Sequence, residues 1–214
     1  VFDNIMVGHL GTTELAAASF SLNIFLIGML LGMGITMGLT PLVGQSFNSN
    51  NRKSIAGWFR NGLLVNFIAS LFLCFAMASV VFFMDRMGQS EEVVQKAIPF
   101  YLLHVASLIP MMLFFSFKQF FEGIGNTKIA MVITIIINIV NIVLNYALIY
   151  GKLGLPALGL YGSGFASLIA RMIMPVLFFV VMLKRPALKG YLIDVFHATF
   201  ERQKIKRLLS IGLS

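Results

Sequence analysis

The chain has 214 residues, of which 58% are hydrophobic and only 11% are charged, and its formal net charge is +8. Soluble domains carry about 25% charged residues, so this composition excludes a water-soluble globule and predicts a membrane protein. The basic residues lie between apolar runs, as they do in cytoplasmic loops, so we expect no nucleic-acid partner. A single cysteine, Cys74, excludes an internal disulfide and a cysteine-based metal site.

The first 183 residues contain five long stretches with few charges. No charged side chain lies between Glu14 and Arg52, and further charge-free windows cover 61–84, 97–117 and 129–151. A helix needs about 20 apolar residues to cross a bilayer. The sequence therefore predicts an all-α polytopic membrane protein. Its five complete transmembrane helices are expected at about residues 14–46, 60–84, 97–121, 128–150 and 159–183.

The two ends of the chain predict parts of two further helices. Residues 1–10 are expected to be the end of a first helix, and residues 206–214 the beginning of a seventh. The chain begins without a methionine and ends within an apolar pattern, so we expect a fragment of a longer protein. The stretch 14–46 is longer than one bilayer thickness, so its helix must tilt, kink near Pro41 or project into water.

Basic residues are distributed unequally over the connections. The connections after the second, fourth and sixth helices hold twelve Lys and Arg residues, whereas the others hold only Arg86, Lys96 and Lys152. The positive-inside rule predicts that the twelve-residue side is cytoplasmic, together with the amino terminus. We expect an amino-terminal transmembrane lobe at 1–183, a cytoplasmic inter-lobe linker at 184–205 and the start of a second lobe at 206–214. The linker either lies along the inner membrane surface as an amphipathic segment or is a solvated connection.

Asp3 is an acid in an otherwise apolar helix segment. The residues from Gly8 to Thr13 have the composition of an outer loop, which places Asp3 about one and a half to two turns inside the outer end of its helix. An acid at that depth is costly unless it faces a partner or water, so Asp3 is a candidate functional residue. The alternative, an acid that only caps the outer boundary of the helix, is left open.

Four polar residues form a row on the predicted helix 128–150. Thr134, Asn138, Asn141 and Asn145 are spaced by four, three and four residues, and this spacing places them on one helical face. Amides that face lipid are left unsatisfied, so the row must face a neighbouring helix or an aqueous cavity. One alternative is hydrogen bonding between helices. The other is a hydrated site whose amide oxygens coordinate a small cation beside a carboxylate.

Two further polar residues fall inside predicted helices. Arg171 lies in the middle of the helix at 159–183 and needs a partner or a route to water. Pro175, four residues later, frees the carbonyl of Arg171, so the local backbone is also a candidate. Functional and structural roles of Arg171 are both left open, whereas His104 is expected to be hydrogen-bonded and structural rather than a proton carrier.

Four stretches of the sequence, taken in order, resemble a known family. They are VFDNIMVGHLGTTELAAAS, GLTPLVGQSFNSNN, QFFEGIGNTKIAM and NIVLNYALIYGKLGLPALGLYGSGFAS, and together they span residues 1–170. They resemble the multidrug and toxic compound extrusion (MATE) transporters, most closely the bacterial multidrug-efflux branch. The resemblance implies twelve helices in two six-helix lobes in the inner (plasma) membrane. This chain is then the amino-terminal lobe without most of helix one, stopping at the start of helix seven.

The resemblance also implies a cation site but no cofactor. Asp3 matches a cation-binding aspartate that is linked to Na⁺ or H⁺ coupling, and Asn141 belongs to the same polar cluster, so Na⁺ is expected at these two residues. Asn145 stands where some relatives carry a second acid, and Ser163 matches a hydroxyl residue that assists the cation in some relatives. The remaining candidates, for a substrate site or a structural polar cluster, are Asn138, Thr134 and Arg171.

The leading functional hypothesis is a secondary antiporter. It exports amphipathic, often cationic, organic compounds while Na⁺ or H⁺ enters, and it binds the drug between this lobe and the carboxy-terminal lobe of the same chain. The sequence has no HExxH, GxSxG or Walker lysine motif, so we expect no enzyme. The alternatives are a lipid-linked oligosaccharide flippase of related fold, an intramembrane enzyme with paired acids or histidines at membrane depth, and a channel.

Overall fold

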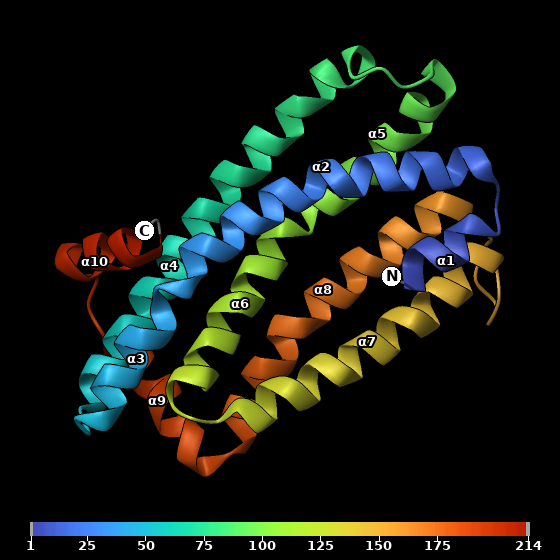
Figure 1. The fold of residues 1–214 in the computed structure, drawn as a ribbon. Coiled ribbons are helices and arrows are strands. Elements are labelled where there is room, and N and C mark those ends of the chain that lie inside the picture. The colour runs from blue at the N-terminus through green and yellow to red at the C-terminus, as the bar shows by residue number, and fades with distance from the viewer. Residues whose placement is uncertain (1, 213–214) are drawn as a thin grey trace.

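The computed structural model describes the backbone of residues 2–212 and the side chains of residues 5–212. All regular elements in this part of the chain are helical (Figure 1). The α-helices are α1 (Phe2–Gly8), α2 (Thr12–Met37), α3 (Leu39–Asn48), α4 (Arg52–Ser79), α5 (Glu91–Ala106), α6 (Leu108–Gly123), α7 (Thr127–Tyr150), α8 (Gly159–Lys184), α9 (Pro186–His197) and α10 (Arg202–Gly212), and a 3₁₀ segment, Val80–Arg86, follows α4.

Five helical segments within residues 2–212 are long and apolar enough to cross a membrane. They are Thr12–Asn48, Arg52–Arg86, Glu91–Gly123, Thr127–Tyr150 and Gly159–Lys184. The number and order of the complete transmembrane helices predicted from the sequence are therefore confirmed. The last two segments begin and end within one residue of the predicted ranges 128–150 and 159–183.

Two of the predicted helices are interrupted, and each break has the same relation to a proline. α2 ends at Met37 and α5 ends at Ala106, which are four residues before Pro41 and Pro110. Proline has no N–H, so the carbonyl four residues earlier loses its helical donor. The break after Met37 lies near Pro41, where a kink is one of the three outcomes predicted for the stretch 14–46. The break at Ser107 differs from the single helix predicted at 97–121.

The start of α4 also differs from its predicted position. The helix begins at Arg52, eight residues before the predicted start at residue 60. Asn51 explains the earlier start, because its side chain accepts a hydrogen bond of 3.0 Å from the backbone N–H of Ser54 and caps the helix. Three basic residues expected in the preceding loop, Arg52, Lys53 and Arg60, therefore lie on the helix.

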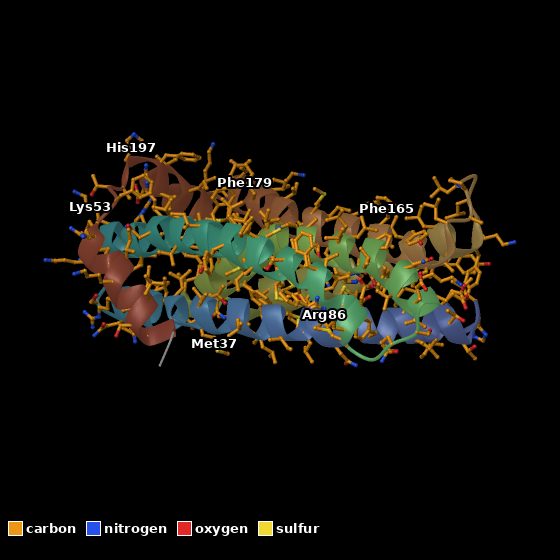
Figure 2. The ribbon with its side chains drawn as sticks, turned by 90° about the horizontal axis from the view of Figure 1, so that it is seen from above. Met37, Lys53, Arg86, Phe165, Phe179 and His197 are labelled. Carbon is orange, nitrogen blue, oxygen red and sulfur yellow. The ribbon has the colours of Figure 1, made fainter. Side chains whose placement is uncertain are left out.

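The connections gather at two opposite ends of the bundle. Figure 1 shows the α3–α4, α6–α7 and α8–α9 connections at one end, and the α1–α2, α4–α5 and α7–α8 connections at the other. The first set, here called the basic end, contains the connections in which the sequence concentrates Lys and Arg. Lys53 and His197 lie at this end, and Arg86 lies away from it (Figure 2).

Aromatic packing dominates the core near the basic end. Phe59 and Phe120 stack with ring centroids 4.3 Å apart, and Phe178 of α8 lies 5.1 Å from Phe121 of α6. We call this group, all of it buried, the phenylalanine cluster: Phe59, Phe114, Phe117, Phe120, Phe121 and Phe178. By contrast, Phe165 and Phe179 are exposed on the outside of the bundle (Figure 2), where a bilayer would cover them.

Candidate functional site

The polar row of α7 changes from exposed to buried along its length. Asn138 is exposed, Asn141 is half-buried, and Asn145 is fully buried. The Asn145 amide nitrogen donates to the backbone oxygen of Asn141 at 3.0 Å and to its side-chain oxygen at 3.2 Å. Thr134 differs, because its hydroxyl donates to Ala130 O of its own helix at 2.8 Å, a common way to satisfy a hydroxyl within a helix.

A cavity of about 210 Å³ lies between α7 and α8 and has a polar wall. Asn138 and Asn141 of α7 line it together with Ser167 and Arg171 of α8. The remaining lining residues are Ile137, Ala170 and Met174. The structure thus brings two of the predicted amides and the predicted intramembrane arginine to one space, which we call the polar cavity.

Arg171 connects the polar cavity to the break between α5 and α6. Its guanidinium donates to the hydroxyl of Ser107, which in turn donates to His104 O at 2.6 Å. The guanidinium also lies over the ring of Phe25 in α2, 4.8 Å from its centroid, in a cation–π contact. One α8 side chain therefore contacts residues of α2 and of the α5–α6 break.

His104 is held in an aromatic pocket. It is buried, its Nδ1 lies 3.1 Å from Phe100 O, and the rings of Phe25 and Phe100 lie against it. A backbone carbonyl can only accept a hydrogen bond, so Nδ1 carries the hydrogen in this arrangement. This geometry favours the structural role expected for His104.

Ser163 lies in a part of α8 that packs closely against α7. It is fully buried, and its hydroxyl has no hydrogen-bond partner within the described part of the chain. The neighbouring Gly162 packs directly against Leu148 O of α7, which leaves no space for a Cβ. A buried hydroxyl without a partner is rare in folded proteins and is a common feature of sites that take a ligand or water.

Asp3 belongs to α1, but its side chain lies outside the described residues. The described part of α1 rests against the end of α7, where the hydroxyl of Tyr150 donates to Met6 O at 3.0 Å. α1 therefore lies beside the end of α7 that carries Asn145 (Figure 1). Whether the Asp3 carboxyl reaches the polar cavity stays a prediction.

A protein-family model described as MatE matches residues 1–147 of the chain. The chain belongs to the MatE family. The probable multidrug resistance protein NorM of Mannheimia succiniciproducens is 32% identical over 218 residues, which cover 99% of this chain and 46% of that protein. The chain thus spans about half the length of the curated relatives it matches. Its relatives in this family are transporters and not enzymes.

Two solved structures of MATE transporters share the fold. One is described as the inward-facing conformation of a multidrug resistance MATE family transporter of the MOP superfamily, and the other as the outward-facing conformation of such a transporter. Both have a TM-score of 0.86 and match 99% of this chain, with 20% and 21% identity. The match covers 47% of the first structure and 46% of the second, as expected for one lobe of a two-lobe MATE fold.

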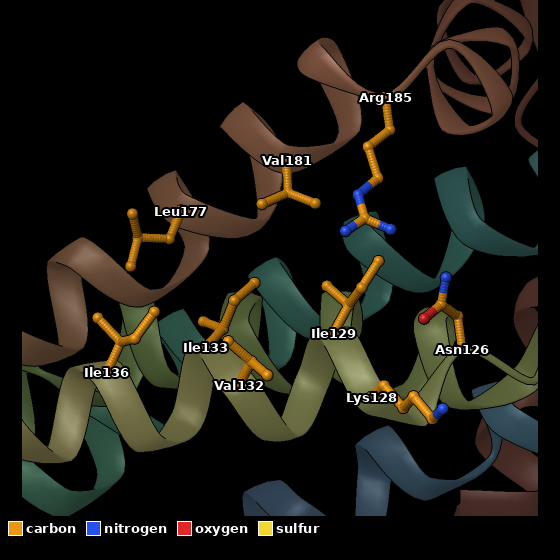
Figure 3. A pocket seen from close by; sticks show the side chains of 9 residues that line it. All are labelled: Asn126, Lys128, Ile129, Val132, Ile133, Ile136, Leu177, Val181 and Arg185. Atoms are coloured by element: carbon orange, nitrogen blue, oxygen red, sulfur yellow. The ribbon is translucent and has the colours of Figure 1, made fainter.

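Two features near the polar cavity of this MATE lobe were missed by reasoning from the sequence. Ser107 and Phe25 hold Arg171 from other helices, and nothing in their own sequence neighbourhoods indicates this contact. A second cavity, of about 370 Å³, lies between α7 and α8 near the basic end. Figure 3 shows that Arg185, Lys128 and Asn126 flank one end of an otherwise apolar space. Its apolar residues on α7 follow a helical spacing typical of lipid-facing or packing residues.

Proposed function

We propose that the full-length protein is a secondary antiporter that exports amphipathic, often cationic, organic compounds in exchange for Na⁺ or H⁺. The observation that carries the proposal is the polar cavity in a MatE-family lobe whose helices are otherwise apolar. Polar groups at membrane depth are costly and mark ion and substrate pathways. The NorM relative is named a probable multidrug resistance protein, which supports drugs as the exported class.

The coupling cation is proposed to bind among oxygen atoms at the α1 side of the polar cavity. Amide and carboxylate oxygens suit hard cations, and Asn141, Asn145, Ser163 and Asp3 supply both kinds together with a hydroxyl. Binding of Na⁺ or H⁺ neutralises Asp3. This binding shifts the lobe between two arrangements only as far as the cation binds them with different affinity. Drug export then follows from reciprocal coupling between cation and drug sites.

The two-lobe architecture supports rigid-body alternation of access. The chain matches inward-facing and outward-facing relatives with the same TM-score, 0.86. A lobe that fits both states equally well supports a cycle in which whole lobes rotate while the packing inside each lobe stays the same. In this proposal the drug binds between this lobe and the carboxy-terminal lobe.

The proposal is tested with the full-length protein in proteoliposomes. Sodium and proton gradients are imposed separately, and efflux of a fluorescent cationic drug is followed. At least one of the gradients is expected to drive efflux against the drug gradient. Drug movement that only follows its own gradient would identify a channel and contradict the proposal.

The basic end is proposed to lie on the cytoplasmic side of the inner membrane. Twelve Lys and Arg residues in its connections and on the helix ends beside them support this orientation through the positive-inside rule. Single cysteines at Lys189 and Lys152, in a full-length variant that has no other cysteine, provide the test in whole cells. An impermeant thiol reagent is expected to label Lys152→Cys and to leave Lys189→Cys unlabelled. The reverse pattern would contradict the orientation.

A further inference from the structure

The segment after α8 is fastened to α4 by two arginines. Arg52 forms an ion pair of 2.6 Å with Asp194 of α9. Arg60 donates two hydrogen bonds, of 2.9 Å to Val195 O and 2.7 Å to Phe196 O. These carbonyls belong to the last turn of α9, which has no helical donors of its own, and a cation there also complements the helix dipole. α9 is therefore capped by the first lobe.

Asn61 fastens the extended connection between α9 and α10. Its side chain is fully buried, its Nδ2 lies 3.2 Å from Thr199 O, and its Oδ1 accepts from the N–H of Glu201 at 3.0 Å. One amide thus holds the backbone on both sides of Phe200, whose ring lies under the Arg60 guanidinium at 4.4 Å. We call Arg52, Arg60 and Asn61 the linker clamp.

α10 meets the end of α2 at two glycines, where backbone atoms of the two segments lie close together. Gly38 has φ −61° and ψ −19°, ordinary helical values, so its backbone conformation does not require glycine. The space does require it, because a Cβ at Gly38 would lie 2.7 Å from Leu208 O and 3.2 Å from Gly212 N. A Cβ at Gly212 would lie 2.6 Å from Ile35 O. We call Gly38 and Gly212 the glycine seam.

The linker clamp and the glycine seam differ in the kind of interaction that holds the segments together. The clamp combines an ion pair with charge-assisted hydrogen bonds, which are stronger than neutral ones. The seam is a close packing of backbone atoms, and dispersion between such atoms falls steeply when they separate by a fraction of an ångström. The clamp is therefore suited to stay closed, and the seam is suited to open and close as a unit.

We propose that the glycine seam is the contact that parts when the two lobes separate at the basic end, while the linker clamp stays closed and serves as the pivot. The proposal rests on the antiporter function and on α10 leading into the second lobe. α9 and residues 198–201 then move with the first lobe. The motion between the lobes then begins within α10, between the clamp and Gly212.

Paired cysteines in the full-length protein, in a background that has no other cysteine, test this difference. A Cβ at Gly38 would lie 3.5 Å from the Cβ of Ile211, so Gly38→Cys with Ile211→Cys reports on the seam. Arg52→Cys with Asp194→Cys is the matched pair across the clamp. A short bis-methanethiosulfonate links each pair, and a reductant removes it. Linking the seam is expected to abolish the efflux that the unlinked double variant retains, until the reductant is added. Linking the clamp is expected to leave the efflux of its own unlinked double variant unchanged.

The two contacts also give a readout that does not depend on transport. Spin labels at exposed positions, Ser49 with Ser210 for the seam and Lys53 with Lys189 for the clamp, are measured by double electron–electron resonance in detergent and in nanodiscs. The seam pair is expected to show two distance populations, and the clamp pair a single one. Wild-type protein without gradient-driven efflux would refute the antiporter but leave this readout intact. Two distance populations for the clamp pair, or a single one for the seam pair, would overturn the proposal that the clamp is the pivot.

A steric series separates the seam from a general effect of substitution in α2. A Cβ at Gly34 would lie 3.6 Å from Gly212 O, an ordinary contact, so Gly34→Ala is the matched control for Gly38→Ala. Gly38→Ala is expected to enlarge the long-distance population of a label pair at Ser49 and Ser210 and to lower efflux. Gly34→Ala is expected to change neither. Equal distance populations and equal efflux in the two variants would overturn the proposed role of the seam.

Discussion

The phenylalanine cluster and the polar cavity share helix α8 but are built in opposite ways. Phe178 is fully buried and contacts rings of α6. Arg171, two turns away, lines a cavity and contacts Ser107 and Phe25. Lipid provides no hydrophobic driving force between helices, so close packing must hold the bundle together. The cluster supplies this packing, and it leaves the other half of α8 free to line a polar space.

The largest expected effect is on transport and concerns the polar cavity. Asp3→Asn removes the ionisable group in the full-length protein and is expected to abolish cation-driven drug efflux, because the amide cannot exchange a proton or carry the charge that Na⁺ neutralises. Membrane insertion is expected to be unchanged. Asp85→Asn, at an exposed position in the 3₁₀ segment, is the control and should transport normally. Wild-type efflux in Asp3→Asn would remove Asp3 from the account.

The largest effect on stability is expected in the phenylalanine cluster. Phe178→Ala leaves a cavity among the rings and is expected to cost about 3–5 kcal/mol in the free energy of unfolding. Phe179→Ala removes the same side chain from the exposed neighbouring position and should cost far less. Thermal unfolding of the purified full-length protein compares the two variants. Efflux per folded molecule should be unchanged in both, and equal losses of stability would contradict the assigned packing.

A smaller effect is expected at Arg171. Lysine keeps the charge of Arg171 but loses the planar guanidinium that bonds Ser107 while it lies over Phe25. Arg171→Lys is expected to lower stability by about 1–2 kcal/mol, the typical sum of one such hydrogen bond and one cation–π contact. It should also slow efflux, whereas the exposed Arg86→Lys should change neither property. Normal stability and efflux in Arg171→Lys would show that only the charge matters.

The smallest effect on stability is expected at Ser163. Its hydroxyl is buried without a partner, so Ser163→Ala removes a desolvated polar atom and is expected to leave thermal stability unchanged or slightly raised. If Ser163 assists the cation, the same variant will need a higher cation concentration for half-maximal efflux. Ser167→Ala, on the same helix and lining the polar cavity, is a useful comparison. Reduced stability with normal cation dependence would make Ser163 structural only.

The sequence predicts those parts of the fold that depend on local signals. α7 has Lys128 in its first turn and is followed by Gly151, and α8 begins at Gly159. The predicted ends of both helices are correct within one residue. A proline alone does not predict the end of a helix. α5 continues through Pro99 and α8 through Pro175, whereas breaks occur before Pro41 and Pro110. The residue type is the same at all four positions, so it does not predict which of these helices ends.

The candidate site likewise has one part that the sequence predicts and one part that it does not. The spacing of Asn138, Asn141 and Asn145 predicts that they share a face, since this depends only on helix geometry. The partners of Arg171 cannot be predicted in this way, because Ser107 and Phe25 reach it from other helices through long-range packing. The role of this site remains a prediction that depends on Asp3.

Cation-dependent stabilisation of the purified full-length protein tests the central claim most directly. A ligand that binds only the folded protein raises its stability in proportion to the logarithm of its concentration above the dissociation constant. Thermal unfolding is measured with increasing Na⁺ at constant ionic strength, and separately on acidification, for wild type and Asp3→Asn. The account predicts that at least one cation raises the unfolding temperature of wild type and has no such effect on Asp3→Asn. An equal rise in both proteins would contradict it.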